Sequence, residues 1–362
     1  MLKFGLEQIT GCLLGGAIGD ALGAPIEFLT IDQIRETFGP AGIDMYVEHQ
    51  NGFGVFTDDT QMTLFTAEGV LRARHQEMLS GEKNDYSSMV YQSYLRWYYT
   101  QNHPPIPEFA QERGNCFLAG WLMEQPGLYQ CRAPGNTCLG SLASGEFGTI
   151  EKIMNNSKGC GGVMRVAPVG MMFYEDPELA FKIGVETAAI THSHPSGYLS
   201  AGCLAAILAF LVQGEGLLDA ILKAMALLED WQNNQECKYA LQGALDKYQT
   251  LGPTPENIET LGRGWVGEEA LAISLFCALH FQSDFRGGVL AAVNHSGDSD
   301  STGAITGNLL GLMLGRDTIP ESWIANLEMV DVVEQVGRDL VIGAEDTIQT
   351  PDHEWGLRYP PC

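Results

Sequence analysis

The chain has 362 residues, of which 45% are hydrophobic and 18% are charged, so it can bury a large core and is not a disordered chain. Its 45 Asp and Glu residues outnumber its 20 Lys and Arg residues and give a formal net charge of -25. A surface with that charge repels nucleic acid and anionic membranes, and no run of basic residues reverses the repulsion. We therefore expect neither a nucleic acid nor a membrane among its partners.

The nine cysteines are scattered and form no CxxC pair, which argues against a disulfide framework or a zinc ribbon and favours reduced thiols. Residues 1–5 lack the apolar core of a signal sequence. The most apolar stretch, 197–212, is short and rich in small residues for a membrane span. The sequence shows no heptad pattern. We expect a cytoplasmic monomer.

Alternating strand patterns are scarce, while Ala, Leu, Gly and Met fill long segments. We therefore predict an all-α fold in a single domain over residues 1–362. Apolar periodicity and helix-start signals predict helices over residues 6–23, 58–74, 86–99, 177–191, 197–212, 217–231, 266–280, 301–315 and 330–342. The range 197–212 is apolar on nearly every face, which predicts a central helix. The range 101–141 is rich in Pro and Gly, which predicts loops within the domain.

Two of the predicted helices carry glycine at every fourth position. The first has Gly11, Gly15, Gly19 and Gly23, and a late one has Gly303, Gly307 and Gly311. A glycine inside a helix costs about 1 kcal/mol relative to alanine. A stripe of them needs a compensating reason, and the usual reason is close approach of packed helix backbones. We predict that each stripe faces a closely packed neighbour, and one stripe facing the other is among the possible arrangements.

Two acidic clusters precede predicted helices near opposite ends of the sequence. Asp58 and Asp59 follow Thr57, while Asp298 and Asp300 lie in the segment 297–303. Helix capping explains each cluster by itself, because a helix N-terminus favours hydroxyl and carboxylate oxygens. Two such clusters in matching positions also suit a hard-metal site assembled by folding, since four aspartates brought together would repel without cations.

Glu27 is a third acidic element, because it follows Pro25 at the point where the first helix must stop. Taken alone, Glu27 would be an ordinary solvated glutamate. Together with the four aspartates it brings the number of carboxylates to five, whose charge two divalent cations would nearly neutralise. A centre with two metal ions is therefore chemically sensible.

Two loops are candidates for binding an anionic substrate. The segment 156–162 is glycine-rich and opens a predicted helix, so its backbone N–H groups could cradle a phosphate, although a plain turn explains it equally. Arg132 lies beside a tight turn and could contact a phosphate or an acceptor, or lie on a surface turn. His192 and His194 precede Pro195, and their position at the end of a helix accounts for both residues. His295 is a candidate to orient Asp298 as a residue next to a metal ligand.

Three separated motifs carry a specific resemblance. The motifs, in chain order, are GCLLGGAIGDALGAPIE at 11–27, TDDT at 57–60 and GDSDS at 297–301. Together they resemble the ADP-ribosylglycohydrolase family, and the similarity continues through 159–165, 191–195 and 264–270. The resemblance runs from near residue 6 to about residue 315. It implies a compact, orthogonally packed multi-helix bundle.

The resemblance also implies a cofactor and site residues. Two Mg²⁺ or Mn²⁺ ions would be held by Thr57, Asp58, Asp59, Asp298, Asp300 and Ser301, with Glu27 beside them. The family commonly has threonine where this chain has Ser301, which keeps the oxygen ligand and loses the methyl group that restrains its rotamer. Glu27 or Asp59 would be the catalytic base. ADP-ribose would contact Ser157, Gly159, Cys160 and Gly161, with Arg132 as a second candidate.

The implied reaction is metal-dependent hydrolysis of the glycosidic bond between ADP-ribose and a protein side chain, with arginine preferred as the acceptor, or a small ADP-ribose conjugate. Two alternatives stay open. A non-catalytic, ADP-ribose-binding or structural relative is one, although the intact aspartates argue against it. A metal-dependent phosphoesterase is the other, because an acidic cluster alone describes both enzymes.

Overall fold

The structure is a computed structural model and describes residues 5–47, 52–101, 117–345 and 353–361. Within these ranges the backbone forms helices and two isolated bridges, and no strand. The α-helices are α1 (Leu6–Gly23), α2 (Ile31–Phe38), α3 (Asp58–Ser80), α4 (Tyr86–Thr100), α6 (Asn136–Ala143), α7 (Ala167–Met172), α8 (Pro177–Ala189), α9 (Pro195–Val212), α10 (Leu217–Leu228), α11 (Gln235–Tyr248), α12 (Pro255–Ile258), α13 (Gly267–His280), α14 (Phe285–Val293), α15 (Ser299–Leu314), α16 (Glu321–Ala325), α17 (Val330–Ala344) and α18 (His353–Arg358).

Each of the nine predicted helical ranges corresponds to a helix, namely α1, α3, α4, α8, α9, α10, α13, α15 and α17. The prediction missed α11 and α14 as well as several helices of eight residues or fewer, because short or mixed segments give a weak periodic signal. In the predicted loop range 101–141, the described residues form the 3₁₀ turns Trp121–Glu124 and Pro126–Tyr129 and the start of α6. Residues 102–116 lie outside the described residues.

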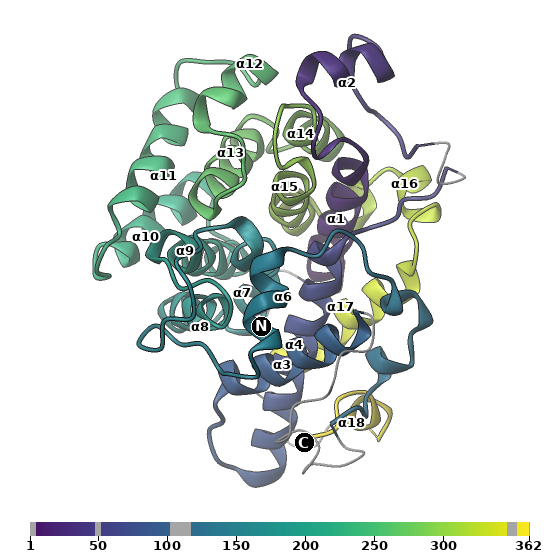
Figure 1. Cartoon of the computed structure of the whole chain (residues 1–362), viewed down its shortest axis with the longest axis vertical. Helices are drawn as coiled ribbons and strands as arrows, with labels where there is room; N and C mark the ends of the chain where they lie inside the picture. The colour runs from purple at the N-terminus through teal and green to yellow at the C-terminus, as the bar shows by residue number, and fades with distance from the viewer. Residues whose placement is uncertain (1–4, 48–51, 102–116, 346–352, 362) are drawn as a thin grey trace.

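The glycine stripes of α1 and α15 face each other, which confirms the packing prediction. A Cβ atom on Gly15 would overlap the carbonyl of Gly307, and one on Gly19 would overlap the carbonyl of Gly303. A Cβ atom on Gly311 would overlap the carbonyl of Gly11. Figure 1 shows the two helices next to each other in the upper middle of the molecule. Only glycine permits this approach, so the helix-propensity cost is offset by backbone contact.

Helix α9 is a core helix, as its composition predicts. It packs against α7, α8, α10 and α13, and its apolar window is 89% buried, as is that of Leu6–Ile26. These are the two described helices long and apolar enough to cross a membrane, but their apolar surface is taken up by neighbouring helices. One cluster of buried apolar side chains extends from Ile9 to Tyr359. The single domain over residues 1–362 stays a prediction.

We expect Gly307→Val to lower the free energy of unfolding by about 3 kcal/mol, because its Cβ atom would overlap the backbone of Gly15 in α1. Gly243→Ala is the matched control, since a Cβ atom there meets nothing within 4 Å and alanine raises helix propensity by up to about 1 kcal/mol. Denaturant midpoints of the two variants measure the difference. Equal midpoints would show that α1 and α15 tolerate separation.

Candidate metal centre

The candidate metal centre lies where three helix ends meet. The chain leaves α1 through the 3₁₀ turn Ala24–Ile26, and Glu27 follows this turn. The N-termini of α3 and α15 lie beside it, and they carry the two acidic clusters. A Cβ atom on Gly23 would overlap the backbone of Ser299 and Asp300. The glycine stripe therefore ends at the site, and it brings Glu27 next to the start of α15.

Both acidic clusters do cap their helices. The hydroxyl of Thr57 accepts a hydrogen bond from the N–H of Asp59 at 3.3 Å, and Thr57 is the N-cap of α3. The carboxylate of Asp298 accepts one from the N–H of Ser301 at 3.3 Å at the start of α15. The capping interpretation is thus confirmed, and it leaves carboxylate oxygens of both clusters directed to one place.

Contacts between the clusters bring the predicted metal ligands together. The hydroxyl of Ser301 donates to Oδ2 of Asp59 at 2.9 Å, and the hydroxyl of Thr57 lies 3.5 Å from Oδ2 of Asp300. Carboxylate oxygens of Glu27, Asp298 and Asp300 lie within 4.8 Å of one another, which suits a shared cation. The structure therefore adds Glu27 to the potential ligands, whereas the resemblance places it beside them.

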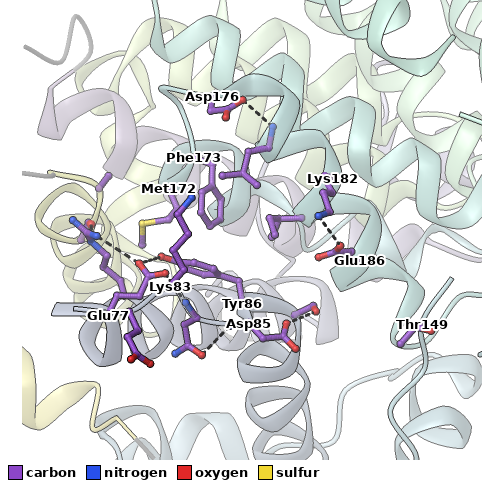
Figure 2. A pocket seen from close by; sticks show the side chains of 18 of the residues that line it. Glu77, Lys83, Asp85, Tyr86, Thr149, Met172, Phe173, Asp176, Lys182 and Glu186 are labelled. Atoms are coloured by element: carbon purple, nitrogen blue, oxygen red, sulfur yellow. Dashed lines mark hydrogen bonds and ion pairs between the residues drawn. The ribbon is translucent and has the colours of Figure 1, made fainter. Parts of the chain in front are cut away.

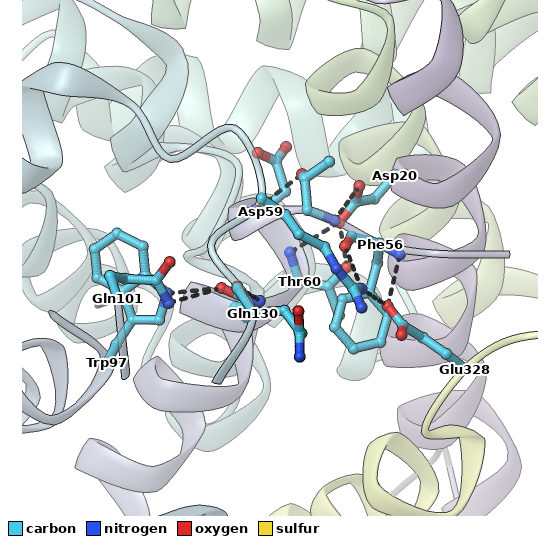
Figure 3. A network of polar contacts seen from close by, with 11 residues as sticks. Asp20, Phe56, Asp59, Thr60, Trp97, Gln101, Gln130 and Glu328 are labelled. Carbon is cyan, nitrogen blue, oxygen red and sulfur yellow. Dashed lines mark hydrogen bonds and ion pairs between the residues drawn. The ribbon is translucent and has the colours of Figure 1, made fainter. Parts of the chain in front are cut away.

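The sequence analysis missed Asp20 as a residue of this site. Its carboxylate is fully buried and accepts hydrogen bonds from the N–H of Thr57 and from both the N–H and the hydroxyl of Thr60, at 2.6 to 3.0 Å. Figure 3 shows Asp20 close to Thr60 and Phe56. Asp20 is the one charged residue between Glu7 and Glu27, and this isolation in an apolar helix was the available signal.

Burial raises the pKa values of the carboxylates of the site, and for most of them neighbouring negative charges raise the pKa further. Burial and then the neighbouring charges of Asp300, Asp58 and Asp20 raise the pKa of Glu27 to about 9. Burial is also the main cause that raises the pKa of Asp58 to about 8 and that of Asp20 to about 7. Burial also raises the pKa values of Asp59, Asp298 and Asp300, and neighbouring charges add to this effect for Asp59 and Asp298. Such a cluster favours either protons or cations.

The glycine-rich loop lies against the acidic clusters. The Cys160 thiol is 2.8 Å from Oδ2 of Asp298. The hydroxyl of Ser157 accepts hydrogen bonds from the hydroxyl of Thr137 at 3.2 Å and from the N–H of Gly159 at 3.3 Å. A Cβ atom on Gly161 would come within 2.8 Å of the buried His192 ring. The structure therefore brings the predicted substrate loop to the predicted metal ligands.

Arg132 supports the turn before α3. Its guanidinium donates to the carbonyl of Phe56 at 3.1 Å and pairs with the carboxylate of Glu328, which also accepts the N–H of Phe56 at 3.0 Å. Three residues further on, the N–H of Gly135 donates to Oδ2 of Asp58 at 3.2 Å. The segment 132–135 therefore contacts the acidic cluster directly, and substrate binding by Arg132 stays a prediction.

The histidines have structural partners. His194 caps α9 by accepting the N–H of Ser196 at 3.1 Å, and His192 pairs with the hydroxyl of Thr191 at 2.9 Å. Burial lowers the pKa of His192 to about 3. His295 contacts the hydroxyl of Thr302 at 3.0 Å, and that hydroxyl donates to the carbonyl of Asp298 at 2.8 Å. His295 thus supports Asp298 through an intermediate residue.

A separate cavity of about 980 Å³ lies at the opposite end of α3 (Figure 2). Glu77 lines it, and this residue is 19 positions after Asp58, which is about 28 Å along a helix. Some of its charged groups pair with neighbours, as in the 3.8 Å contact of Lys182 with Glu186 and the 2.6 Å hydrogen bond from Tyr86 to Glu77. The cavity is therefore not part of the acidic site.

The fold and the site define an all-helical protein with a carboxylate-based centre beside a glycine-rich loop. The profile of the ADP-ribosylglycohydrolase family matches residues 3–349, and the chain belongs to that family. A solved structure described as an ADP-ribosylglycohydrolase-related protein complex superimposes with a TM-score of 0.64 over 94% of this chain and 99% of that chain, at 23% identity. This agreement confirms the predicted compact, orthogonally packed all-α bundle.

Curated relatives resemble the chain over most of their own length. It is 24% identical to ADP-ribosyl-[dinitrogen reductase] glycohydrolase of Rhodospirillum rubrum, over 89% of this chain and 91% of that protein. It is 23% identical to an ADP-ribosylarginine hydrolase of Pseudomonas putida, over 92% and 78%. It is 23% identical to ADP-ribosylhydrolase ARH3 of Danio rerio, over 92% and 90%.

The side chains present fit hard divalent cations. All the donors are carboxylate or hydroxyl oxygens, which Mg²⁺ and Mn²⁺ prefer, and each of the four clustered aspartates is at most 5% exposed. Three carboxylates lie within reach of one ion. Burial and the neighbouring carboxylates raise the pKa values of Glu27 and Asp58, and bound divalent cations would favour the deprotonated forms.

We expect added Mg²⁺ to raise the melting temperature more at about pH 8.5 than at about pH 6. The raised pKa values of Glu27, about 9, and Asp58, about 8, exceed those of unfolded carboxyl groups, which are about 4. The metal-free fold therefore binds more protons than the unfolded chain and loses stability as the pH rises through this interval. Metal ions bind the deprotonated groups. Equal shifts in thermal denaturation at both pH values would contradict this account.

Proposed function

We propose that the protein is a metal-dependent hydrolase that cleaves the glycosidic bond between ADP-ribose and a modified protein side chain, with arginine as the preferred acceptor, and releases ADP-ribose. The observation that carries the proposal is the convergence of Glu27, Asp298 and Asp300 within 4.8 Å, beside the glycine-rich loop. A relative named as an ADP-ribosylarginine hydrolase supports the choice of arginine.

The diphosphate of the substrate must be bound by local donors, because the chain as a whole carries a charge of -25. Lys158, the one basic residue of the loop 156–162, forms ion pairs with Glu236 at 2.9 Å and Glu268 at 3.0 Å. Its charge is therefore largely compensated. The backbone N–H groups of Gly159, Cys160 and Gly161 are the donors that we propose for phosphate.

In this proposal the carboxylates bind the metal ions and transfer the proton. Thr57, Asp58, Asp59, Asp298, Asp300 and Ser301 would hold two Mg²⁺ or Mn²⁺ ions, and Glu27 is close enough to share them. When bound, the ions would supply Lewis acidity that orients the ribose hydroxyls and acidifies a water molecule. Glu27 or Asp59 would accept a proton from the water that forms the new bond to C1 of the ribose, through an oxocarbenium-like state, while the bond from C1 to the acceptor atom breaks and the released acceptor takes up a proton.

The proposal extends to the cellular setting. We propose that the chain acts as a cytoplasmic monomer on an ADP-ribosylated protein or a small ADP-ribose conjugate. Its strong negative charge supports a partner that is neither nucleic acid nor an anionic membrane.

Incubation of the protein with an arginine-ADP-ribosylated protein and Mg²⁺ or Mn²⁺ should release free ADP-ribose, identified by mass. Release should stop with a chelator and in an Asp298→Ala/Asp300→Ala variant. AMP or phosphate as the product would replace the proposal with a phosphoesterase. Binding of ADP-ribose without release from arginine, serine or small conjugates would indicate a non-catalytic relative.

Two single variants should separate metal binding from catalysis. Asp300→Ala should lose metal and activity together, because the Asp300 carboxylate lies beside Thr57 of the other cluster and within 4.8 Å of the carboxylates of Glu27 and Asp298. Glu27→Gln should reduce turnover by a factor of about 100 or more while metal binding weakens much less, since the amide keeps an oxygen ligand but cannot accept the proton. Calorimetric titration and turnover measure the two effects. Full activity in either variant would contradict the assigned roles.

A further inference from the structure

We propose that Cys160 is a positioning residue of the metal centre, whose thiol fixes the Asp298 carboxylate and ties the substrate loop to the metal ligands. This inference rests on the proposed function, because it concerns the ions that the carboxylates would hold. It gives the Cys160 side chain a role besides the backbone contact to ADP-ribose that the resemblance implies.

The thiol and the carboxylate form a donor–acceptor pair. The sulfur lies 2.8 Å from Oδ2 of Asp298, and the S–H group donates to this oxygen. The other oxygen, Oδ1, accepts the N–H of Ser301 at 3.3 Å. The carboxylate is therefore held from both sides, in the orientation that brings it toward Glu27 and Asp300.

The thiol also contacts the second half of the centre. The hydroxyl of Ser301 lies 3.6 Å from the Cys160 sulfur and 2.9 Å from Oδ2 of Asp59. Cys160 and Ser301 thus link ligands at the N-termini of α3 and α15. Groups that hold ligands in this way usually govern metal affinity by a factor of about 10 to 100.

The backbone around the thiol is firmly anchored. Cys160 begins the 3₁₀ turn Cys160–Gly162, and its carbonyl accepts the N–H of Val163 at 2.9 Å. The carbonyl of Lys158 accepts the N–H of Gly267 at 2.8 Å, and the carbonyl of Arg263 accepts the N–H of Asp298 at 2.8 Å. The segment leading into α13 therefore holds both the loop and the aspartate, which fixes the distance between thiol and carboxylate.

Cys160 differs in its surroundings from the other described cysteines. The structure describes seven free cysteines, of which Cys12, Cys138, Cys203, Cys237 and Cys277 are buried and Cys131 is exposed. Cys160 is half-buried, and among the described cysteines it is the one that donates to a carboxylate. A small substitution at a half-buried position leaves the core intact, so the contact can be removed without unfolding the chain.

The test is calorimetric titration of the metal-free protein with Mn²⁺ alone, for the wild type, Cys160→Ala, Cys160→Ser and the surface control Cys131→Ala. Alanine removes the donor and should weaken Mn²⁺ binding by a factor of about 10 or more. Serine keeps an O–H donor and should restore binding to within about threefold of the wild type. The control should bind as the wild type does, and the melting temperature of all metal-free variants should be unchanged.

Unchanged Mn²⁺ affinity in Cys160→Ala would overturn the inference, as would a serine variant as weak as the alanine variant. If Cys160→Ala lowers the melting temperature of the metal-free protein, Cys160→Val replaces it in the test, because valine fills the space of the thiol without a hydrogen-bond donor. Its Mn²⁺ affinity is then compared with that of Cys160→Ser. Absence of Mn²⁺ binding in the wild type would instead contradict the metal centre itself, and therefore both the proposed function and this inference. These outcomes are all decided by Mn²⁺ affinity and melting temperature, so no measurement of enzyme activity is needed.

Discussion

The site depends on the direct backbone contact between α1 and α15. Along this contact, glycine faces glycine, and the carbonyl oxygens of one helix fill the positions where side chains of the other would lie. The last glycine of the stripe, Gly23, lies against Ser299 and Asp300, so the same contact that joins the helices also brings the end of α1 to the start of α15. A larger residue along the stripe would separate the helices and move Glu27 away from the aspartates.

The second constraint is the cost of gathering acidic groups in a buried place. Helix N-termini reduce that cost, because their unpaired N–H groups and their dipoles favour negative charge. Asp298 is the N-cap of α15, and Thr57 is the N-cap of α3. The carboxylate of Asp20 accepts hydrogen bonds from the N–H groups of Thr57 and Thr60, at the start of α3. Burial and the remaining repulsion between carboxylates raise the pKa values of Glu27 and Asp58. The arrangement that caps the two helices also suits cations, so capping and the proposed cation binding do not compete as explanations.

The loops around the site are positioned by residues far away in the sequence. Glu328 holds Arg132 beside Phe56, and Glu236 and Glu268 hold Lys158 in the glycine-rich loop. Acidic side chains thus pair with Arg132 and Lys158, so the proposal assigns the anionic substrate to backbone N–H groups and metal ions. This explains how a protein with a charge of -25 can belong to a family whose named members act on ADP-ribose conjugates.

The sequence by itself determined the helical class, the long helices, the glycine stripes and the acidic clusters, because each is a local pattern with a fixed spacing along one helix. It also determined the family, through motifs such as those at 57–60 and 297–301. Only the tertiary structure decided that the two stripes face each other, that Asp20 supports Thr57 and Thr60, and that Arg132 pairs with Glu328. Likewise, the hydrogen bond from Cys160 to Asp298 joins residues 138 positions apart. No local pattern specifies such pairs, because their distance depends on how the helices between them pack.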